Sequence, residues 1–335
     1  MIHTREQLKK DFIQKNGWGD ATISFLAGDC SNRTYDRLVK KDKTTAVLMD
    51  AYGDNEKVEP FMAISSLLND LGCSAPKVLS QDFENRFLLL EDFGDQTFTW
   101  CLGKGMDAGL LYETAVDALI HLHQKFDRST SSTLPVYDTK SLLEKANLFL
   151  EWYFPAIHGT VPSTAIIQEW EDAWCQAFQV IDKAPQTLIL RDFHVDNLLW
   201  LQDREGFKRC GLLDFQDAAI GPQCYDLVSL FEDVRQDVSF DLTKRLLKKY
   251  LRSFPDLDEH TFMTQYYTMG AQRATRIIGV FARMLLAKNR DHYMRFIPRT
   301  WKWLENDLKH DNLLAIRHWF NEYFPMEKRR ELTCL

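Results

Sequence analysis

Two short segments rich in acidic and amide side chains constrain this chain most strongly. The first is residues 188–200, LILRDFHVDNLLW, and the second is residues 212–216, LLDFQ. Apolar runs flank the polar part of the first segment, which predicts two strands joined by a hairpin-like loop that carries Asp192 and Asn197. Because a third apolar run ends at Asp214, we expect these three oxygen-bearing side chains to converge.

This set of side chains suits phosphoryl transfer from a nucleotide. The carboxylate of Asp192 would act as the general base for an acceptor hydroxyl. Asn197 and Asp214 would bind Mg²⁺, a hard cation that prefers oxygen ligands. An aspartate in an ordinary turn does not explain the spacing of all three residues. The two segments therefore predict a catalytic loop that uses ATP and Mg²⁺.

The spacing D-x-x-x-x-N followed by D-F resembles the catalytic loop and metal-binding motif of the protein-kinase superfamily. His194 stands two residues after Asp192, as in the aminoglycoside phosphotransferase (choline-kinase-like) family, where protein kinases carry Lys. Residues 221–227, GPQCYDL, are similar to a segment of that family in which an aspartate, here Asp226, braces the catalytic loop. The resemblance implies a small-molecule kinase. His194 would hydrogen-bond within the loop or reach the γ-phosphate, and a purely structural role is the alternative.

Further motifs narrow this resemblance. Residues 47–51 (VLMDA) and 272–283 (QRATRIIGVFAR), together with the catalytic segments, resemble the bacterial N-acetylmuramate/N-acetylglucosamine anomeric kinases of peptidoglycan recycling over nearly the whole chain. The resemblance implies ATP-dependent phosphorylation of the anomeric hydroxyl of an amino sugar. Two alternatives stay open here: a kinase of an amino alcohol or aminoglycoside, and a nucleotide-binding pseudokinase.

Hydrophobic periodicity and the resemblance together predict an α+β chain with the bilobal protein-kinase-like fold. The N-terminal nucleotide-binding lobe is expected at residues 1–93, and the mostly helical catalytic and acceptor-binding lobe at residues 94–335. A five-stranded antiparallel sheet is predicted from strands at residues 23–26, 35–39, 45–51, 76–79 and 86–90. Helices are predicted at residues 5–16, 56–71, 110–126, 142–153, 226–234, 242–253, 261–288, 293–308 and 313–323.

The nucleotide-facing residues are expected in the turn after the first strand and in the segment after the fifth strand. By the resemblance, the second segment is a hinge whose main-chain groups hydrogen-bond adenine. The residues expected to contact the nucleotide are Gly28, Ser31, Asn32, Arg33, Glu91, Asp92 and Phe93. As bare sequence, both segments also suit ordinary turns.

The third predicted strand lacks the cation with which protein kinases hold the α- and β-phosphates. Its residues 47–50 read VLMD, so Met49 stands where protein kinases and many of their relatives carry Lys. Arg33 and Arg37 lie on one face of the second strand by period-two counting. We expect one of these arginines to supply the missing charge, with solvent-facing strand arginines as the alternative.

Basic residues late in the chain indicate an anionic acceptor. Arg276 and Arg283 are seven residues apart in a predicted helix and so share one face. An arginine fork can hold the lactyl carboxylate of N-acetylmuramate with two hydrogen bonds. Bracing of acidic residues in the catalytic core is the alternative. Glu232 and Asp233 are expected to accept hydrogen bonds from sugar hydroxyls.

Charge and composition exclude several other classes. The formal net charge of -7 opposes binding to nucleic acid. No uninterrupted apolar run approaches the roughly 18 residues that a membrane span needs. Seven cysteines without a C-x-x-C pair favour a reducing, cytoplasmic location over a disulfide framework. The resemblance implies an amino-sugar substrate, and the sequence leaves the oligomeric state open.

Overall fold

The computed structural model describes residues 4–28, 33–53, 57–130, 134–329 and 332. The chain packs as two compact units. Unit 1 consists of Met1–Lys125 and Asp196–Asp217, and unit 2 of Phe126–Val195 and Ala218–Leu335. The chain therefore passes from unit 2 into unit 1 and back again around the predicted catalytic segments. The lobe boundary at residue 93 stays a prediction.

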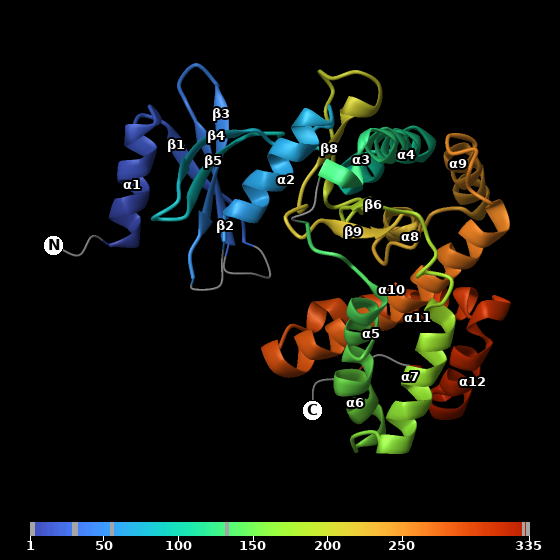
Figure 1. Cartoon of the computed structure of the whole chain (residues 1–335). Coiled ribbons are helices and arrows are strands. Elements are labelled where there is room, and N and C mark those ends of the chain that lie inside the picture. The colour runs from blue at the N-terminus through green and yellow to red at the C-terminus, as the bar shows by residue number, and fades with distance from the viewer. Residues whose placement is uncertain (1–3, 29–32, 54–56, 131–133, 330–331, 333–335) are drawn as a thin grey trace. The chain divides into compact units, whose positions relative to one another are not determined.

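Unit 1 is built on a five-stranded antiparallel sheet with the strand order β1-β2-β3-β5-β4 (Figure 1). Its strands are β1 (Thr22–Gly28), β2 (Arg33–Val39), β3 (Thr45–Ala51), β4 (Val78–Asp82) and β5 (Phe87–Glu91). Its helices are α1 (Arg5–Lys15), α2 (Glu59–Asp70), α3 (Phe98–Gly103) and α4 (Ala108–Lys125). A hairpin of β7 (Leu198–Trp200) and β8 (Cys210–Leu212) also belongs to this unit. The predicted five-stranded sheet is thus confirmed.

One face of the sheet packs against α1. Leu38, Leu48 and Leu89 point to this face and form a buried core cluster with Phe12 and Ile13 of the helix. In the register of β3 and β5, Leu48 lies opposite Leu89, and residues opposite one another in an antiparallel pair share a face. The period-two pattern of the strands therefore decides which residues α1 covers.

The other face of the sheet carries the alternate residues of the same strands. Tyr35 lies opposite Met49, and Val47 lies opposite Leu90. Figure 1 shows α2 on this side of the sheet, away from α1. Phe61 of α2 lines the same cavity as Tyr35 and Val47. The cavity described below therefore opens on the face of the sheet that α1 does not cover.

Unit 2 is mostly helical (Figure 1). Its helices are α5 (Thr139–Ala146), α6 (Phe154–His158), α7 (Thr164–Phe178), α8 (Tyr225–Phe231), α9 (Phe240–Arg252), α10 (Glu259–Lys288), α11 (Ile297–Asp307) and α12 (Leu314–Tyr323). Strands β6 (Gln186–Ile189) and β9 (Ala219–Pro222) form a two-stranded antiparallel sheet. A π-helical turn at Phe149–Tyr153 separates α5 from α6.

The predicted pairing of the strands around the catalytic loop is wrong. The strand before the loop, β6, pairs with β9, whereas the strand after it, β7, pairs with β8. Alternating apolar residues identify a strand, but they do not identify its partner. The loop at residues 190–197 therefore joins two separate antiparallel pairs, the first in unit 2 and the second in unit 1.

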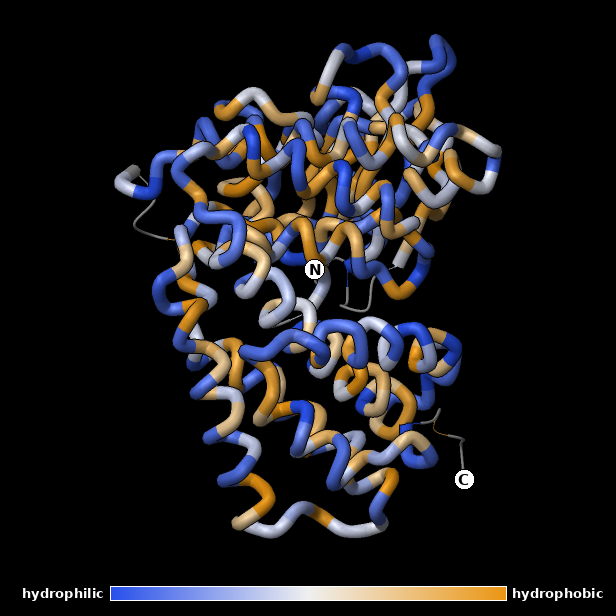
Figure 2. The backbone as a smooth tube through the Cα atoms, turned by 90° about the vertical axis from the view of Figure 1, so that its right-hand side faces the viewer, coloured by the Kyte–Doolittle hydropathy of each residue, from blue (hydrophilic) through white to orange (hydrophobic). Residues whose placement is uncertain are grey.

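Within the described residues, no helix has the length and apolarity needed to cross a membrane. Figure 2 shows polar and apolar residues alternating along the helices. Even the 30-residue α10 carries charged residues along its length, including Arg273, Arg276 and Arg283.

Gly279 brings α10 into direct contact with the backbone before the π-helical turn. A Cβ atom at this position would lie 2.5 Å from the Phe149 nitrogen and 2.6 Å from the Leu148 oxygen. This backbone cannot move aside freely, because the Phe149 ring stacks on Trp170 with the ring centroids 5.7 Å apart. The glycine of the late sequence motif is therefore a packing requirement.

We expect Gly279→Ala to lower the free energy of unfolding by about 3 kcal/mol, because the added methyl group meets main-chain atoms. Urea unfolding followed by circular dichroism would measure this change. Gly103→Ala is the control, since a Cβ atom there meets nothing within 4 Å. The control should stay within about 0.5 kcal/mol of the wild-type protein. Equal stability of the two variants would contradict the described packing.

Candidate active site

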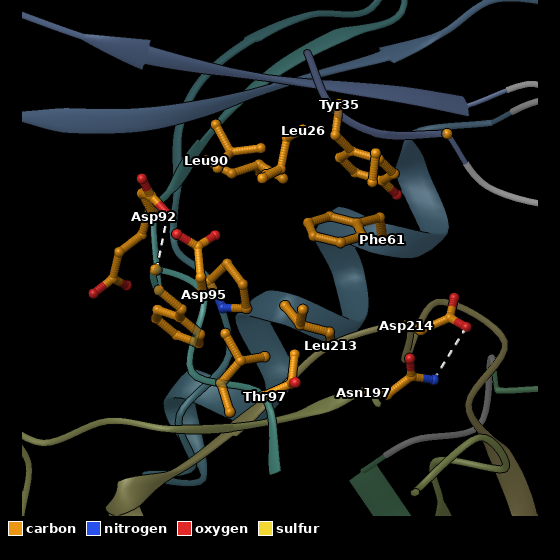
Figure 3. A pocket seen from close by; sticks show the side chains of 18 residues that line it. Leu26, Tyr35, Phe61, Leu90, Asp92, Asp95, Thr97, Asn197, Leu213 and Asp214 are labelled. Atoms are coloured by element: carbon orange, nitrogen blue, oxygen red, sulfur yellow. Dashed lines mark hydrogen bonds between the residues drawn. The ribbon is translucent and has the colours of Figure 1, made fainter. Parts of the chain in front are cut away.

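Unit 1 contains a mainly apolar cavity of about 430 Å³, a volume that suits a small organic ligand (Figure 3). Its apolar wall includes Leu26, Tyr35, Val47 and Leu90 from the sheet, Phe61 from α2, and Leu213 after β8. In Figure 3, Leu26 and Leu90 lie on one side of the cavity, and Leu213 and Thr97 on the other. Two facing apolar surfaces of this kind suit a flat ring such as a nucleobase.

The predicted hinge forms one wall of the cavity, and its carboxylates are held by ion pairs. Arg37 of β2 lies 2.8 Å from an oxygen of Asp92 and 2.8 Å from an oxygen of Asp95. Hydrogen bonds to Asp95 and Asp92 raise the pKa of Arg37. Asp92 also accepts a hydrogen bond from the Gly94 N–H at 2.9 Å. The side chain of Asp92 is therefore occupied within the hinge itself.

Arg204 contacts the side chains of the other two hinge residues. The Glu91 side chain pairs with Arg204 at 2.7 Å, and the guanidinium of Arg204 lies 4.8 Å from the ring centroid of Phe93. The Glu91 N–H already donates to the Lys77 carbonyl at 2.9 Å. Adenine recognition by this hinge would therefore use the Glu91 carbonyl and the main chain of the following residues.

The residues predicted from the first turn are only partly described. Gly28 lines the cavity at the end of β1. Ser31 and Asn32 lie outside the described residues, so their expected contacts with the nucleotide stay predictions. Arg33 begins β2 and is buried.

Asn197 and Asp214 lie together at the polar end of the cavity (Figure 3). The hairpin of β7 and β8 positions them, because Asn197 precedes β7 and Asp214 follows β8, and the Leu213 N–H donates to the Asn197 carbonyl at 2.9 Å. The Asn197 amide nitrogen donates to Asp214 at 3.3 Å, and the Gln216 amide nitrogen donates to the other Asp214 oxygen at 2.7 Å. Asp214 has a φ of 56°, an uncommon backbone conformation for a residue with a side chain.

This pair fits the ligand preference of a magnesium ion. Mg²⁺ is usually bound by one or two carboxylates together with substrate phosphates and water, and an amide oxygen is a further hard ligand. Among the described residues, no cluster of three or more His, Cys, Asp or Glu side chains could hold a metal ion. An ion at this pair would therefore depend on oxygen ligands from outside the protein as well.

Asp192 lies in unit 2, in the loop that follows β6. The buried carboxylate of Asp226 in α8 accepts hydrogen bonds from the Leu190 N–H at 2.6 Å and from the Arg191 N–H at 2.9 Å. These are the contacts expected of a brace. Arg191 has a φ of 69°, so the chain turns sharply just before Asp192, whose side chain is 33% exposed. The convergence of Asp192 with the Asn197 and Asp214 pair stays a prediction.

Two arginines of α10 lie next to this loop within unit 2. A guanidinium nitrogen of Arg276 lies 4.0 Å from an Asp192 oxygen. Arg273 donates to the Ser229 hydroxyl at 2.9 Å, and that hydroxyl donates to the Arg191 carbonyl at 3.3 Å. The two arginines therefore connect α10 to the catalytic loop at two points.

Arg283 lies about 10 Å further along α10 than Arg276, as seven residues at the helical rise of about 1.5 Å require. Its Nε atom is buried. The structure therefore places Arg276 beside Asp192. The contact of Arg283 with the acceptor stays a prediction.

His194 is buried in the same loop. Its main-chain N–H donates to the Asp192 carbonyl at 3.1 Å. Burial lowers the pKa of His194 well below its usual value, and the nearby charges of Arg235 and Arg273 act in the same direction. His194 is therefore a neutral imidazole near pH 7, and whether it contacts the acceptor or the phosphate stays a prediction.

Glu232 and Asp233 are enclosed in unit 2. The Asp233 carboxylate is fully buried and pairs with Arg235 at 3.1 Å. The Glu232 carboxyl group lies beside Gly270, where a Cβ atom would come within 2.6 Å of its oxygen and also contact Asp307. The contact of Glu232 and Asp233 with sugar hydroxyls stays a prediction. Their burial does not support it.

The buried Glu232 and Asp307 pair should make stability depend on pH. Burial raises the pKa of Glu232 to about 7, while burial and the neighbouring Glu232 raise the pKa of Asp307. Tyr266, Tyr267, Arg273, Cys224 and Asn306 also interact with the pair. Because the folded chain holds these protons at a pH where the unfolded chain has released them, the contribution of the pair to the free energy of unfolding falls as the pH rises between about 5 and 7. The lowered pKa of His194 contributes with the opposite sign.

We expect each proton held by this pair to lower the free energy of unfolding by roughly 1 kcal/mol per pH unit. This contribution should be smaller in Asp307→Asn. Urea unfolding of the wild-type protein and of this variant, at pH 5.5 and 7.5, would measure it. An identical pH dependence of the two proteins would contradict the shared burial of the carboxyl groups.

Sequence reasoning missed most of the cavity wall and the ion pairs of the hinge. The wall residue Val47 could have been found by period-two counting along β3 from Met49, which lies opposite Tyr35. Finding Leu90 also requires the register of β3 and β5. No sequence signal marks the pairing of Arg37 with the hinge or of Arg204 with Glu91, because these partners are far apart in the chain.

Comparison with known proteins places the chain in a family. The sequence profile described as the phosphotransferase enzyme family (APH) matches residues 22–262. The N-acetylmuramate/N-acetylglucosamine kinase of Caulobacter vibrioides is 33% identical, with 97% of this chain and 98% of that protein covered. The protein of the same name from Pseudomonas aeruginosa is 31% identical, with 86% of this chain and 85% of that protein covered.

Two solved structures show the same fold. The aminoglycoside phosphotransferase APH(2″)-IIa in its gentamicin complex gives a TM-score of 0.62 at 14% identity, covering 94% of this chain and 99% of its own. A choline/ethanolamine kinase family protein from Mesorhizobium loti gives a TM-score of 0.62 at 13% identity, covering 94% and 100%. The predicted α+β, protein-kinase-like fold is thereby confirmed. With its profile match across most of the chain, this protein belongs to the phosphotransferase enzyme family.

Proposed function

We propose that this protein transfers the γ-phosphoryl group of ATP to the anomeric hydroxyl of an N-acetylated amino sugar, N-acetylmuramate or N-acetylglucosamine, and so forms a sugar 1-phosphate. The relatives that are 30–33% identical carry the name of N-acetylmuramate/N-acetylglucosamine kinases, which supports this acceptor. A cytoplasmic location, where ATP is available, is part of the proposal.

The observation that carries the proposal is the composition of the cavity in unit 1. It combines apolar walls, a hinge with available main-chain groups, and a polar end formed by Asn197 and Asp214. The first two features suit a nucleobase, and the third suits a magnesium-bound phosphate. One cavity thus offers groups that suit the nucleobase and groups that suit a magnesium-bound phosphate.

Asp192 would act as the general base for the acceptor. Its partly exposed carboxylate would accept the proton of the sugar hydroxyl as the hydroxyl oxygen bonds to the γ-phosphorus. The bond between that phosphorus and the β-phosphate oxygen would break to release ADP. Asp226 holds the loop through the Leu190 and Arg191 N–H groups, so that the carboxylate keeps one position. The proton then passes from Asp192 to solvent.

Asn197 and Asp214 would hold Mg²⁺. When bound, Mg²⁺ neutralises the charge of the phosphate oxygens. Gln216 donates to Asp214 and so fixes the direction of its carboxylate.

Arg276 would bind an anionic acceptor beside the base. Its side chain is 13% exposed, and a guanidinium nitrogen lies 4.0 Å from an oxygen of Asp192. A guanidinium suits the carboxylate of N-acetylmuramate, which N-acetylglucosamine lacks.

A side-by-side acceptor screen tests the proposal. ADP release would be measured with N-acetylmuramate, N-acetylglucosamine, choline and kanamycin, each at the same enzyme and Mg·ATP concentrations. We expect turnover with at least one of the two sugars and none with choline or kanamycin. Turnover with choline or kanamycin alone would instead assign the enzyme to an amino alcohol or an aminoglycoside.

A further inference from the structure

The cavity of unit 1 offers no cation to the phosphate groups of a nucleotide. Among the described residues that line it, none is Lys, Arg or His, whereas Glu91, Asp92, Asp95 and Asp214 are acidic. Met49 of β3 is fully buried at the position where protein kinases carry their phosphate-binding Lys. Since a nucleoside triphosphate is a polyanion, a cation elsewhere in the unit would add to the positive charge that Mg²⁺ supplies.

Strand β2 carries two cations on the cavity side of the sheet. Arg33, Tyr35 and Arg37 alternate along the strand and therefore share a face. Tyr35 lines the cavity and lies opposite Met49 in the register of β2 and β3. The strand rise of about 3.4 Å per residue places each arginine Cα atom roughly 7 Å from that of Tyr35, in opposite directions. The two arginines thus lie toward opposite ends of the cavity.

Arg37 is at the hinge end of the cavity. Its guanidinium is within 2.8 Å of carboxylate oxygens of both Asp92 and Asp95. It would have to break both pairs to reach a phosphate. Arg37 therefore stabilises the hinge, which lies at the end of the cavity that suits the nucleobase.

Arg33 is at the other end, next to the start of α2. It is 8% exposed, and a guanidinium nitrogen donates to the Lys57 carbonyl at 3.4 Å. Because Arg33 is the diagonal neighbour of Met49 across the strand pair, their Cβ atoms are about 7–8 Å apart. An arginine side chain spans that distance. The Arg33 guanidinium is therefore within reach of the space that a Lys at position 49 would occupy.

We propose that Arg33 supplies the positive charge for the nucleotide phosphates, so that the cation lies on β2 instead of β3. The inference rests on the proposed function, because it requires a nucleoside triphosphate as the donor. A guanidinium can form two hydrogen bonds with phosphate oxygens. Arg33 thus compensates for Met49, and Arg37 keeps the hinge in place.

Binding of Mg·ATP and of adenosine, measured by isothermal titration calorimetry, tests this assignment. Arg33→Met should weaken Mg·ATP binding by about 10- to 100-fold and leave adenosine binding within about twofold, because adenosine has no phosphate. Arg37→Met is the matched control, because it makes the same change as Arg33→Met on the same face of β2. It should change the affinities for Mg·ATP and for adenosine by the same factor, because Arg37 acts on the hinge and both ligands carry the nucleobase.

A second variant returns the charge to β3. Met49→Lys, made in the Arg33→Met protein, should restore Mg·ATP affinity to within about threefold of the wild-type value. If Arg33→Met does not fold, Arg33→Gln serves in the same comparison.

Unchanged Mg·ATP affinity in Arg33→Met would overturn the assignment. So would equal losses for Mg·ATP and adenosine, which would mark Arg33 as a purely structural residue, or a double variant that regains no affinity. A wild-type protein that binds neither ligand would instead refute the proposed function.

Discussion

Asp192→Asn is expected to lower kcat by about 10²- to 10⁴-fold, the range that a positioned general base contributes. Asparagine keeps the size of the side chain but cannot take the proton of the acceptor hydroxyl. The affinity for Mg·ATP should not change, because every described residue that lines the nucleotide cavity belongs to unit 1 and Asp192 belongs to unit 2. Steady-state kinetics and nucleotide titration would separate the two quantities.

Asp203→Asn is the control for this experiment. Asp203 is exposed in the turn between β7 and β8, so the same chemical change there should leave kcat within about twofold of the wild-type value. A kcat that survives in Asp192→Asn would contradict the assignment of the base. If the wild-type protein bound nucleotide without any turnover, the pseudokinase reading would stand instead.

Asp214→Asn is expected to lower kcat/KM by roughly 10³-fold. It removes the negative charge of the pair that would hold Mg²⁺, and charge stabilisation at a phosphoryl group is worth several kcal/mol. The variant should also need a higher Mg²⁺ concentration to bind ATP, which can be measured without turnover. Asn197 and the hairpin of β7 and β8 would remain in place, so the fold should be intact.

Asp217→Asn provides the comparison for Asp214→Asn. Asp217 is exposed three residues after Asp214, and its replacement should leave the Mg²⁺ dependence of ATP binding unchanged. An unaltered Mg²⁺ requirement in Asp214→Asn itself would show that this carboxylate does not hold the ion.

The sheet of unit 1 was predictable because its strands repeat with period two, and five strands were expected where five are found. Most helix positions in unit 2 were predictable for a similar reason, but α6 and α7 were not among the predicted helices. The segment at 293–308 was expected to be one helix, but α11 begins only at Ile297. Pro298 suits the first turn of a helix and interrupts an earlier start, and this signal was present in the sequence.

Strand partners and ion pairs could not be predicted in the same way. The pairing of β6 with β9 and of β7 with β8 depends on which strand meets which after the chain folds. Likewise, the period-two pattern of the strand predicted that Arg33 and Arg37 share a face. The ion pairs of Arg37 with Asp92 and Asp95 are visible only in the folded structure. The spacing of Asn197 and Asp214 predicted that they meet, because the hairpin between them is local.

The most direct test of the proposed function is phosphorus NMR of the product formed from ATP and N-acetylmuramate or N-acetylglucosamine. Phosphorylation of the anomeric hydroxyl predicts a phosphate signal coupled to the anomeric proton of the sugar, together with one equivalent of ADP. A phosphate coupled to any other sugar proton, or ADP formed with inorganic phosphate alone, would contradict it.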